Sequence, residues 1–326
     1  MNILINGGAG YIGSHVLKQL GEEGKHNLTV IDNLVTGFED AITYGEFINA
    51  DLSDYDTIDK IFEEKKFDAV IHFAASLVVP ESVSDPLKYY MNNTANTANI
   101  IRLCIKYNVN KFIFSSTAAT YGEPDADQIP VKETTPTAPI NPYGSSKLMS
   151  ETVLKDTAFA FKDFNYIALR YFNVAGASID GKIGQSTLNA THLIKVAAET
   201  ALGKRDKMFV FGDDYNTPDG TCIRDYIHVE DLASAHLKAL EYLDEHNQSN
   251  IFNCGYGHGF SVKEVLDTMR KVSDVNFVAD MHDRRAGDPA ILISDNSKIR
   301  SIMKWEPKYD DLELICKTAL EWERKI

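Results

Sequence analysis

Tyr143 and Lys147 are the two residues whose types and spacing best suit acid–base chemistry. They stand four positions apart, and Pro142 directly before them suits the first turn of a helix. Residues at i and i+4 share a helix face, so we expect the two side chains to lie together. A free phenol has a pKa of about 10, but a nearby ammonium favours the phenolate. The pair could then remove a proton from a substrate hydroxyl.

A run of small and hydroxyl residues from 114 to 122 ends a predicted buried strand. Ligands of parallel α/β sheets bind at the carboxyl ends of the strands, so Thr117 could bridge a substrate hydroxyl and Tyr143. Hydroxyls at a strand end also cap free backbone groups. We expect that simpler role for some of the neighbouring residues Ser115, Ser116 and Thr120.

The glycines of GGAGYIG, residues 7–13, form a second group with a chemical purpose. Gly8, Gly10 and Gly13 satisfy G-x-G-x-x-G, and Gly7 gives a second, overlapping pattern. Without Cβ atoms, the backbone can approach a pyrophosphate at a helix N-terminus. Asp32 follows Gly13 by 19 residues and ends the next predicted strand, where a carboxylate binds ribose hydroxyls and repels a 2′-phosphate. The pattern predicts NAD, rather than NADP, as the cofactor.

Asp51 and Leu52 follow another short β-like run. A polar and an apolar residue at a strand end could hold the edge and the face of an adenine. A plain helix cap at Asp51 explains the same residues equally well.

These residues require a scaffold of alternating strands and helices. β-rich runs occupy 2–6, 28–32, 69–73, 111–115 and 166–170, and helical patterns lie at 12–23, 57–64 and 94–107. Such alternation predicts βαβ units, that is, an α/β Rossmann-type fold with a parallel sheet flanked by helices. From about Phe172 the rhythm loosens. We expect an NAD-binding domain over 1–172 and a smaller mixed α/β substrate domain over 173–326, some of whose segments cross back to the first.

Composition narrows the partners. The chain of 326 residues has 33 basic and 47 acidic side chains and a net charge of −14, which argues against nucleic acid and membrane partners. The first residues already form a strand, so we expect no signal peptide, and no apolar run is long enough to span a membrane. The isolated cysteines predict reduced thiols in the cytoplasm and no metal site; they are Cys104, Cys222, Cys254 and Cys316.

Taken together, the motifs resemble the extended short-chain dehydrogenase/reductase superfamily. The motifs are GGAGYIG, Asp32, HFAA (72–75), SSTAATYG (115–122), NPYGSSK (141–147) and RYFNVAGA (170–177). Later segments resemble those of UDP-glucose 4-epimerases, namely THLIKVA (191–197), GDDYNTPDGTCIRDYIHVEDLA (212–233) and RRAGDPA (284–290). The resemblance runs from residue 1 to beyond 310.

The resemblance implies an epimerase that oxidises and re-reduces C4 of UDP-glucose or UDP-galactose with tightly bound NAD. It also implies a homodimer formed through two helices of the first domain. In the reaction, Tyr143 would be the base, Lys147 its electrostatic partner and Thr117 the hydroxyl relay. The residues expected at NAD are Gly7, Gly10, Tyr11, Ile12, Gly13, Asp32, Asn33, Asp51, Leu52, Phe73, Ala74, Ala75, Asn92, Ser115, Tyr143, Lys147 and Phe172. Those expected at the UDP-sugar are Thr117, Asn173, His192, Leu193, Phe211, Arg224, Arg285, Asp288 and Leu292. Without the motifs, Arg224 would be an ion-pair partner of Asp225, and His192 a structural histidine.

Two positions depart from the family pattern or vary within it. Leu77 stands where some members carry a lysine that reaches the cofactor, so that contact is missing here. Leu292 falls where residue size varies among members. This leaves room for UDP-N-acetylglucosamine and UDP-N-acetylgalactosamine as further substrates.

Three other functions compete with the epimerase. A sugar-nucleotide 4,6-dehydratase would carry Asp-Glu after the threonine, whereas Ala118 and Ala119 cannot transfer protons. A decarboxylase of the superfamily lacks the run at 212–233. A non-catalytic NAD-binding regulator would be expected to lose Tyr143 and Lys147, and both are present.

Overall fold

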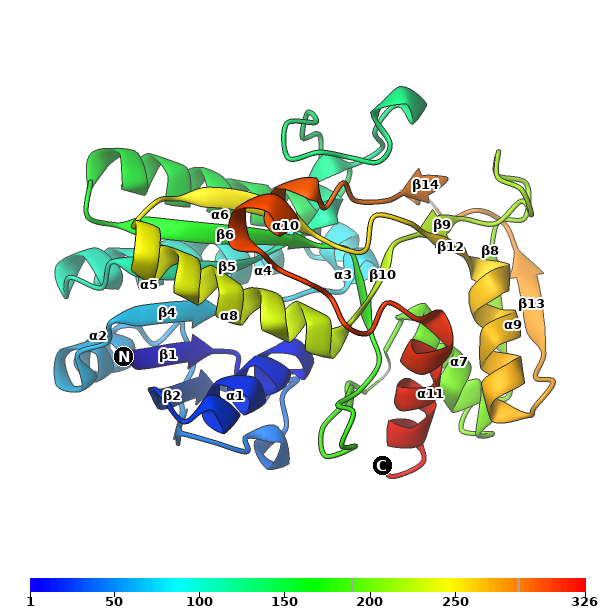
Figure 1. Cartoon of the computed structure of the whole chain (residues 1–326), viewed down its shortest axis with the longest axis horizontal. Coiled ribbons are helices and arrows are strands. Elements are labelled where there is room, and N and C mark those ends of the chain that lie inside the picture. Colours follow the sequence, from blue (N-terminus) through cyan, green and yellow to red (C-terminus); the bar gives the residue numbers. More distant parts are fainter. Residues whose placement is uncertain (189, 286–287) are drawn as a thin grey trace.

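A seven-stranded parallel sheet forms the centre of the molecule (Figure 1). The computed structural model describes residues 1–188, 190–285 and 288–326. In the sheet the strand order is β11-β6-β5-β4-β1-β2-β3, and every neighbouring pair is parallel. The strands are β1 (Asn2–Asn6), β2 (Asn27–Asp32), β3 (Glu46–Asn49), β4 (Ala69–His72), β5 (Lys111–Thr117), β6 (Asn165–Tyr171) and β11 (Asn250–Cys254).

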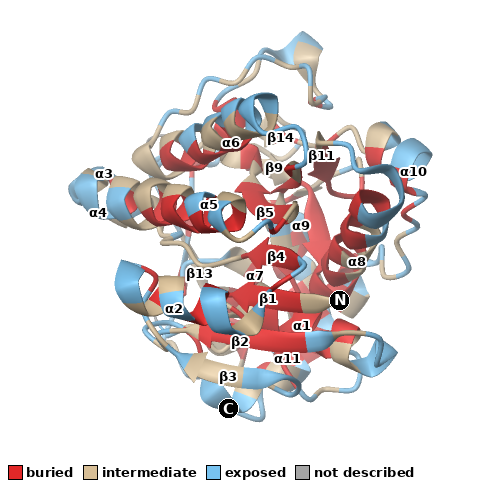
Figure 2. Ribbon diagram, turned by 90° about the vertical axis from the view of Figure 1, so that its left-hand side faces the viewer, coloured by how far each residue is buried: buried red, intermediate tan, exposed pale blue. Residues whose placement is uncertain are grey.

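Helices cover both faces of this sheet, which is why its strands are apolar on both sides. The two faces are distinguished by their buried clusters: α1 and α8 lie on one face, and α2, α5 and α6 on the other. Figure 2 shows the central strands buried and the outer sides of α3 and α4 exposed. The helices are α1 (Tyr11–Glu23), α2 (Tyr55–Lys65), α3 (Val79–Ser84), α4 (Pro86–Tyr89), α5 (Asn96–Lys106), α6 (Pro142–Ala160) and α8 (Val229–His246).

The rest of the chain forms a smaller mixed layer beside the carboxyl ends of the strands. Three helices pack on one another there: α7 (Leu193–Ala201), α9 (Val262–Ser273) and α11 (Leu312–Glu323). Short strands pair as β7 (Asn173–Ala175) with β10 (Tyr226–His228), and as β8 (Met208–Phe211) with β13 (Ala279–His282). A three-stranded sheet has the order β12 (Phe260–Ser261), β9 (Ile223–Arg224), β14 (Ile291–Leu292), and α10 (Ser297–Met303) packs near β11.

The expected Rossmann-type α/β fold is confirmed. The five predicted strands are present with ends that differ by at most two residues. Helix α8 and strand β11, both beyond residue 172, return to the first sheet, where β11 pairs with β6.

One predicted helix differs in kind. The helix expected over 94–107 is α-helical only from Asn96, and Tyr90–Ala95 form a wider π-helix before it. A π-turn inserts an extra residue, which changes the direction in which the following side chains point.

Candidate active site

The glycine turn brings the end of β1 close to the end of β4. Gly7 has φ +77°, and a Cβ there would lie 2.6 Å from the backbone nitrogen of Ala74. Gly10 is the N-cap of α1 and has no side chain to accept the N–H groups of the first turn. Those donors and the helix dipole therefore face the space above the turn. This geometry fits the pyrophosphate of a dinucleotide.

Asp32 ends β2 beside that turn. Its carboxylate accepts hydrogen bonds from the backbone of Ala9 (3.0 Å) and Leu34 (2.9 Å). Burial raises the pKa of this carboxyl, and the two hydrogen bonds oppose the rise. The carboxylate is thus held in place at the position expected for a ribose ligand.

Asp51 lies next to Asn33 at the same edge of the sheet. The amide of Asn33 donates to Asp51 at 2.7 Å, and the other carboxylate oxygen accepts from Ser53. The side chain that caps α2 is Asp54, which accepts from the backbone of Thr57. The interpretation of Asp51 as the helix cap is therefore wrong, because the cap is Asp54, three residues later.

Tyr143, Lys147 and Thr117 meet where α6 passes the end of β5. Tyr143 stands in the first turn of α6, and Lys147 follows it by one turn and donates to the carbonyl oxygen of Ser115 at 2.8 Å. The hydroxyl of Thr117 accepts from the backbone of Ala119 at 3.1 Å, and its proton is donated toward Tyr143. The structure thus brings Tyr143 to Thr117 and Lys147 to Ser115 at the end of the same strand.

The charges of this group depart from the simplest expectation. Burial raises the pKa of Tyr143, and the hydrogen bond from Thr117 opposes that rise only in part. Burial also lowers the pKa of Lys147 to about 7, although the negative charge of Glu151 works against it. We expected the ammonium of Lys147 to stabilise the phenolate of Tyr143. In the chain alone, burial has the larger effect and raises the pKa of this phenol.

The other residues expected at a cofactor follow the same edge of the sheet. Asn92 lies in the π-helix and donates to the hydroxyl of Ser76 at 2.9 Å. Directly after β4 and β6, or at the end of β5, come Phe73, Ala74, Ala75, Phe172 and Ser115. Parallel strands end at one edge, so residues far apart in the sequence meet there.

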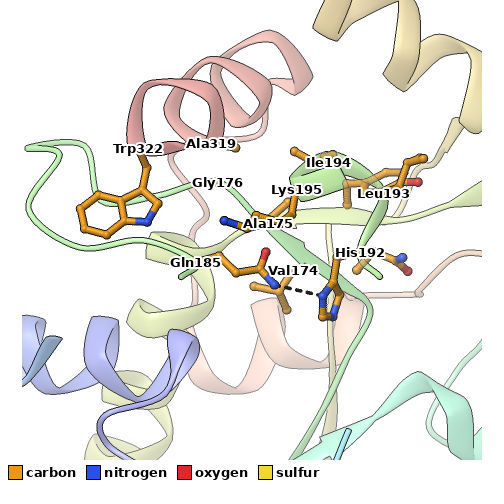
Figure 3. Close-up of a pocket in the computed structure, with 12 residues that line it drawn as sticks. Val174, Ala175, Gly176, Gln185, His192, Leu193, Ile194, Lys195, Ala319 and Trp322 are labelled. Carbon is orange, nitrogen blue, oxygen red and sulfur yellow. Dashed lines mark hydrogen bonds between the residues drawn. The ribbon is translucent and has the colours of Figure 1, made fainter. Parts of the chain in front are cut away.

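A pocket at the start of α7 contains part of the expected substrate residues (Figure 3). His192 is the N-cap of α7, Leu193 is the first residue of that helix, and Asn173 also lines the pocket. The amide nitrogen of Gln185 lies 3.0 Å from Nδ1 of His192. Donation from Gln185 to Nδ1 leaves the proton of a neutral imidazole on Nε2, where it can serve as a donor.

Two arginines form a second group around Asp288. Arg285 makes two hydrogen bonds to this carboxylate, at 3.0 and 3.1 Å, and Arg224 approaches it to 3.8 Å. The guanidinium of Arg285 also lies 5.5 Å from the ring centre of Phe211. Two cations around one anion leave a net positive charge, which suits a diphosphate.

Asp225 is not the partner of Arg224. Its carboxylate is buried and accepts from the backbone of Tyr256 (2.8 Å) and from the hydroxyl of Ser294 (2.6 Å). Asp225 lies between β9 and β10 and is bound to these partners, whereas Arg224 approaches Asp288. The alternative pairing considered for Arg224 is therefore wrong.

Leu292 and Leu77 occupy different surroundings. Leu292 is buried in a small cluster with Ala118, Tyr121 and Val131, against which Phe172 packs. Leu77 is 43% exposed and supplies no charged group.

Several residues near the site escaped the sequence analysis. Tyr89 is buried and places its ring edge-on to that of Tyr143. Gln185 and Trp322 line the pocket at α7 but belong to no motif. Glu151 had a readable signal, because it continues the face of Tyr143 and Lys147 by one more turn.

The part of the chain that the structure describes also bears on metal, thiol and membrane sites. It contains no group of three or more His, Cys, Asp or Glu side chains arranged to hold a metal ion. All four cysteines are free and buried. Among the described helices, none combines the length and apolar character of a membrane span.

Comparison with known proteins gives full-length similarities. Residues 3–255 match the family described as the NAD dependent epimerase/dehydratase family. The chain is 49% identical to the UDP-glucose 4-epimerase of Azospirillum brasilense over 99% of this chain and 92% of that protein. The structure of the UDP-Glc/GlcNAc 4-epimerase from Campylobacter jejuni is 60% identical, with a TM-score of 0.87 over 100% of this chain and 99% of that one. The UDP-glucose 4-epimerase of Brucella ovis, in complex with NAD, is 44% identical, with a TM-score of 0.94 over 98% and 97%.

Proposed function

This chain belongs to the NAD dependent epimerase/dehydratase family, and from that premise we propose that it interconverts UDP-glucose and UDP-galactose by inverting C4. The observation that carries the proposal is the contact of Tyr143 with Thr117 and of Lys147 with Ser115 at the end of β5, in the same parallel sheet whose strand β1 ends at the glycine turn. That arrangement puts an acid–base group and a dinucleotide site at the carboxyl ends of one sheet. The full-length relatives named as UDP-glucose 4-epimerases support it.

The cofactor of the proposal is NAD, which when bound would supply the hydride acceptor and donor for C4 of the sugar. The uncapped first turn of α1 and the positive φ of Gly7 fit its pyrophosphate. We propose that Asp32 holds the adenosine ribose, that Asn33, Asp51 and Leu52 surround the adenine, and that the remaining strand-end residues named above line the nicotinamide half. The carboxylate of Asp32 would repel the 2′-phosphate of NADP and therefore favours NAD.

The chain's own part in the reaction is proton transfer. Tyr143 takes the proton of the C4 hydroxyl as hydride leaves the same carbon, and Thr117 passes it along a hydrogen bond. Lys147 donates to the carbonyl oxygen of Ser115, one helical turn after Tyr143, and would supply the positive charge that favours the phenolate. When hydride returns, Tyr143 gives the proton back, so the enzyme ends each turnover in its starting state.

We propose that the UDP part lies over residues 173–326 and the cofactor over 1–172. Arg224 and Arg285 would take the diphosphate in place of their present partner, Asp288. The pocket at α7 would hold the adjoining part through Asn173, His192 and Leu193. Phe211, beside Arg285, would place its aromatic ring against the uracil base of UDP.

A dehydratase, a decarboxylase and a non-catalytic regulator are not favoured. Ala118 and Ala119 follow Thr117 where a dehydratase needs acidic residues, and Ala118 is buried. The full-length similarity is to epimerases, and the catalytic pair is complete.

The proposal extends to N-acetylated UDP-sugars. The relative from Campylobacter jejuni is described as acting on both UDP-Glc and UDP-GlcNAc. Leu292 contacts the group of residues next to Thr117, so its size would limit the space for an acetyl group. Leu292→Tyr is expected to suppress turnover of UDP-N-acetylglucosamine and to spare UDP-glucose. Wild-type protein that ignores the acetylated sugar, or a variant that loses both activities equally, would contradict this role.

We further propose a homodimer that works in a reducing compartment, the cytoplasm. Three exposed apolar side chains lie along α4, the π-helix and α6, namely Leu87, Met91 and Met149. A second copy could cover them. Light scattering should give twice the mass of one chain, and Met149→Glu should lower the measured mass.

The four buried, free thiols support the proposal that the protein works in the reducing cytoplasm.

The function is tested by product identification. Pure protein is incubated with UDP-galactose, and the products are separated and identified; we expect UDP-glucose to form without added NAD. Denaturing the same sample should release NAD(H) in near-equal amount to the chain. Recovery of a 4-keto-6-deoxy sugar, or of no product with NAD bound, would instead favour a dehydratase or a regulator.

A further inference from the structure

A buried polar network adjoins the catalytic group on the side away from the glycine turn. Its centre is Glu151, 3% exposed, whose carboxylate accepts from the hydroxyl of Ser116 at 2.5 Å. Arg170, 4% exposed, donates to both oxygens of Glu151, at 2.9 and 2.6 Å. A carboxylate with three such donors is fixed in both position and orientation.

The network continues to a distant part of the chain. Arg170 also donates to the hydroxyl of Tyr121 at 3.0 Å and lies over its ring. That hydroxyl donates to Asn253 of β11 at 2.6 Å, and Asn253 donates to the carbonyl oxygen of Val131 at 2.8 Å. The contacts join α6, β5, β6 and β11 at the edge of the sheet where Tyr143 and Lys147 lie.

Glu151 stands in a particular relation to the catalytic residues. It follows Lys147 by four residues and Tyr143 by eight, so all three share one face of α6. Its partner Ser116 lies between Ser115, which binds Lys147, and Thr117. Resting on the proposed epimerase activity, we propose that Glu151 is a positioning residue: it fixes α6 to the end of β5 and supplies the buried negative charge that supports the ammonium of Lys147.

The surroundings of Lys147 leave this task to Glu151. His72 on β4 is neutral, because burial, with a further contribution from Lys147, lowers its pKa to about 3. On α6 and β6, burial raises the pKa of the phenols of Tyr143 and Tyr171, so neither is a fixed negative charge in the way that Glu151 is. Arg170 is positive and forms an ion pair with Glu151. Within the described chain, Glu151 is the acid whose charge raises the pKa of Lys147 against its burial.

The direct test measures the charge of Lys147 in the holoenzyme. Protein labelled with ¹³C at lysine Cε is titrated by NMR, and the resonance of Lys147 is assigned by its loss in Lys147→Met. Glu151→Gln keeps the size of the side chain and removes its charge. It should lower the titration midpoint of Lys147 by about one pH unit, as expected for losing a neighbouring opposite charge. Asp231→Asn, which neutralises a buried carboxylate bound to Tyr256 and the backbone of Lys308, should leave the midpoint unchanged.

Kinetics of the same variants give the second readout. Because Lys147 is charged only below its pKa, a lower pKa makes turnover fall at lower pH. Glu151→Gln should therefore shift the basic limb of kcat by about the same pH unit and lower kcat several-fold, with little change in KM for UDP-galactose. Glu151→Asp, which keeps the charge, should restore the limb toward wild type. If Glu151→Gln does not fold, the double variant Glu151→Gln with Arg170→Gln takes its place in both experiments. The double variant removes both charges, so neither is left buried without a partner.

The outcomes separate this inference from the proposed function. Wild-type protein without turnover refutes the function, while the NMR midpoint still decides the role of Glu151. An active wild type with an unshifted midpoint in Glu151→Gln overturns the inference. A shifted midpoint with wild-type kcat and pH profile, or failure of both variants to fold, overturns it too, since the network would then serve stability alone.

Discussion

Tyr143 depends on close neighbours that differ in what they contribute. Thr117 lowers the pKa of the phenol through a hydrogen bond, whereas burial raises it. Tyr89 packs edge-on at 6.4 Å between ring centres and hydrogen-bonds elsewhere, to Val78 and Glu81. The first neighbour bears on chemistry and the second on packing, so hydroxyl deletions at the two tyrosines separate the roles.

Tyr143→Phe removes the proposed base and keeps the ring. Turnover of UDP-galactose should fall by about 10²–10⁴-fold, the usual contribution of a general base, while UDP binding measured by calorimetry stays near wild type. Tyr89→Phe, the matched control, should lower the free energy of unfolding by about 1 kcal/mol and leave turnover within a few-fold. Near-normal activity of Tyr143→Phe would remove this residue from the mechanism.

Arg285 and Arg284 are adjacent arginines with different partners. Arg285 faces Asp288 and Phe211, and Arg284 pairs with Asp214 over the ring of Tyr215. Arg285→Ala should raise KM by about 10- to 100-fold, the value of a charge-assisted hydrogen bond, with kcat nearly unchanged because the diphosphate is remote from C4. Arg284→Ala should leave both constants close to wild type. Steady-state kinetics would refute the assignment if Arg285→Ala lowered kcat at constant KM.

At the scale of elements, α6 carries the proposed acid–base residues, and its start decides where Tyr143 stands. Asn141 caps this helix by accepting from the backbone of Gly144 at 2.9 Å, and Pro142 occupies the first turn. Helix α11 has a comparable cap, Asp311, which accepts from the backbone of Glu313 at 2.8 Å. The two caps therefore allow the same perturbation to be made near the catalytic group and far from it.

Asn141→Ala and Asp311→Ala should each lower the free energy of unfolding by about 1 kcal/mol, measured in urea. Only Asn141→Ala should also reduce kcat, by about tenfold, because fraying of the first turn displaces Tyr143 and small displacements of catalytic groups are expensive. Equal kcat in the two variants would show that the cap does not hold Tyr143. A larger kcat loss in Asp311→Ala would point to long-range effects of α11.

At the scale of the whole molecule, the chain does not divide cleanly at residue 172. Strand β11 pairs with β6 along five residues, and α8 covers the same face of the sheet as α1. Phe252 of β11 and Leu232 of α8 are fully buried there. Both elements belong to the part of the chain that we propose binds the substrate, so the two regions share one core.

The fragment 1–172 is accordingly expected not to fold. It would expose the edge of β6 and the sheet face that α8 covers, which favours aggregation. Near-ultraviolet circular dichroism and light scattering should show neither fixed packing nor a monodisperse particle. The fragment 1–255 restores α8 and β11 and should recover secondary structure and NAD binding. Cooperative unfolding of 1–172 with bound NAD would contradict this view of the core.

The sequence by itself determined the parts of the protein that depend on short-range spacing. The glycines at 7–13 and Asp32 belong to one βαβ unit, and Tyr143 and Lys147 lie one helical turn apart. The periods of strands and helices were therefore enough to predict where these residues lie along their elements. The alternative role weighed for Arg224, an ion pair with its neighbour along the chain Asp225, failed because the carboxylate it approaches, Asp288, lies across the fold.

Only the tertiary structure decided the contacts between segments that are far apart. Glu151, Arg170, Tyr121 and Asn253 form one network, although no motif joins them. The place of β11 at the sheet edge depends on which strand leaves an unpaired edge, and the pKa of Lys147 depends on how deeply the assembled fold buries it. Burial and strand order arise from the packing of the whole chain, so no local pattern of residues carries them.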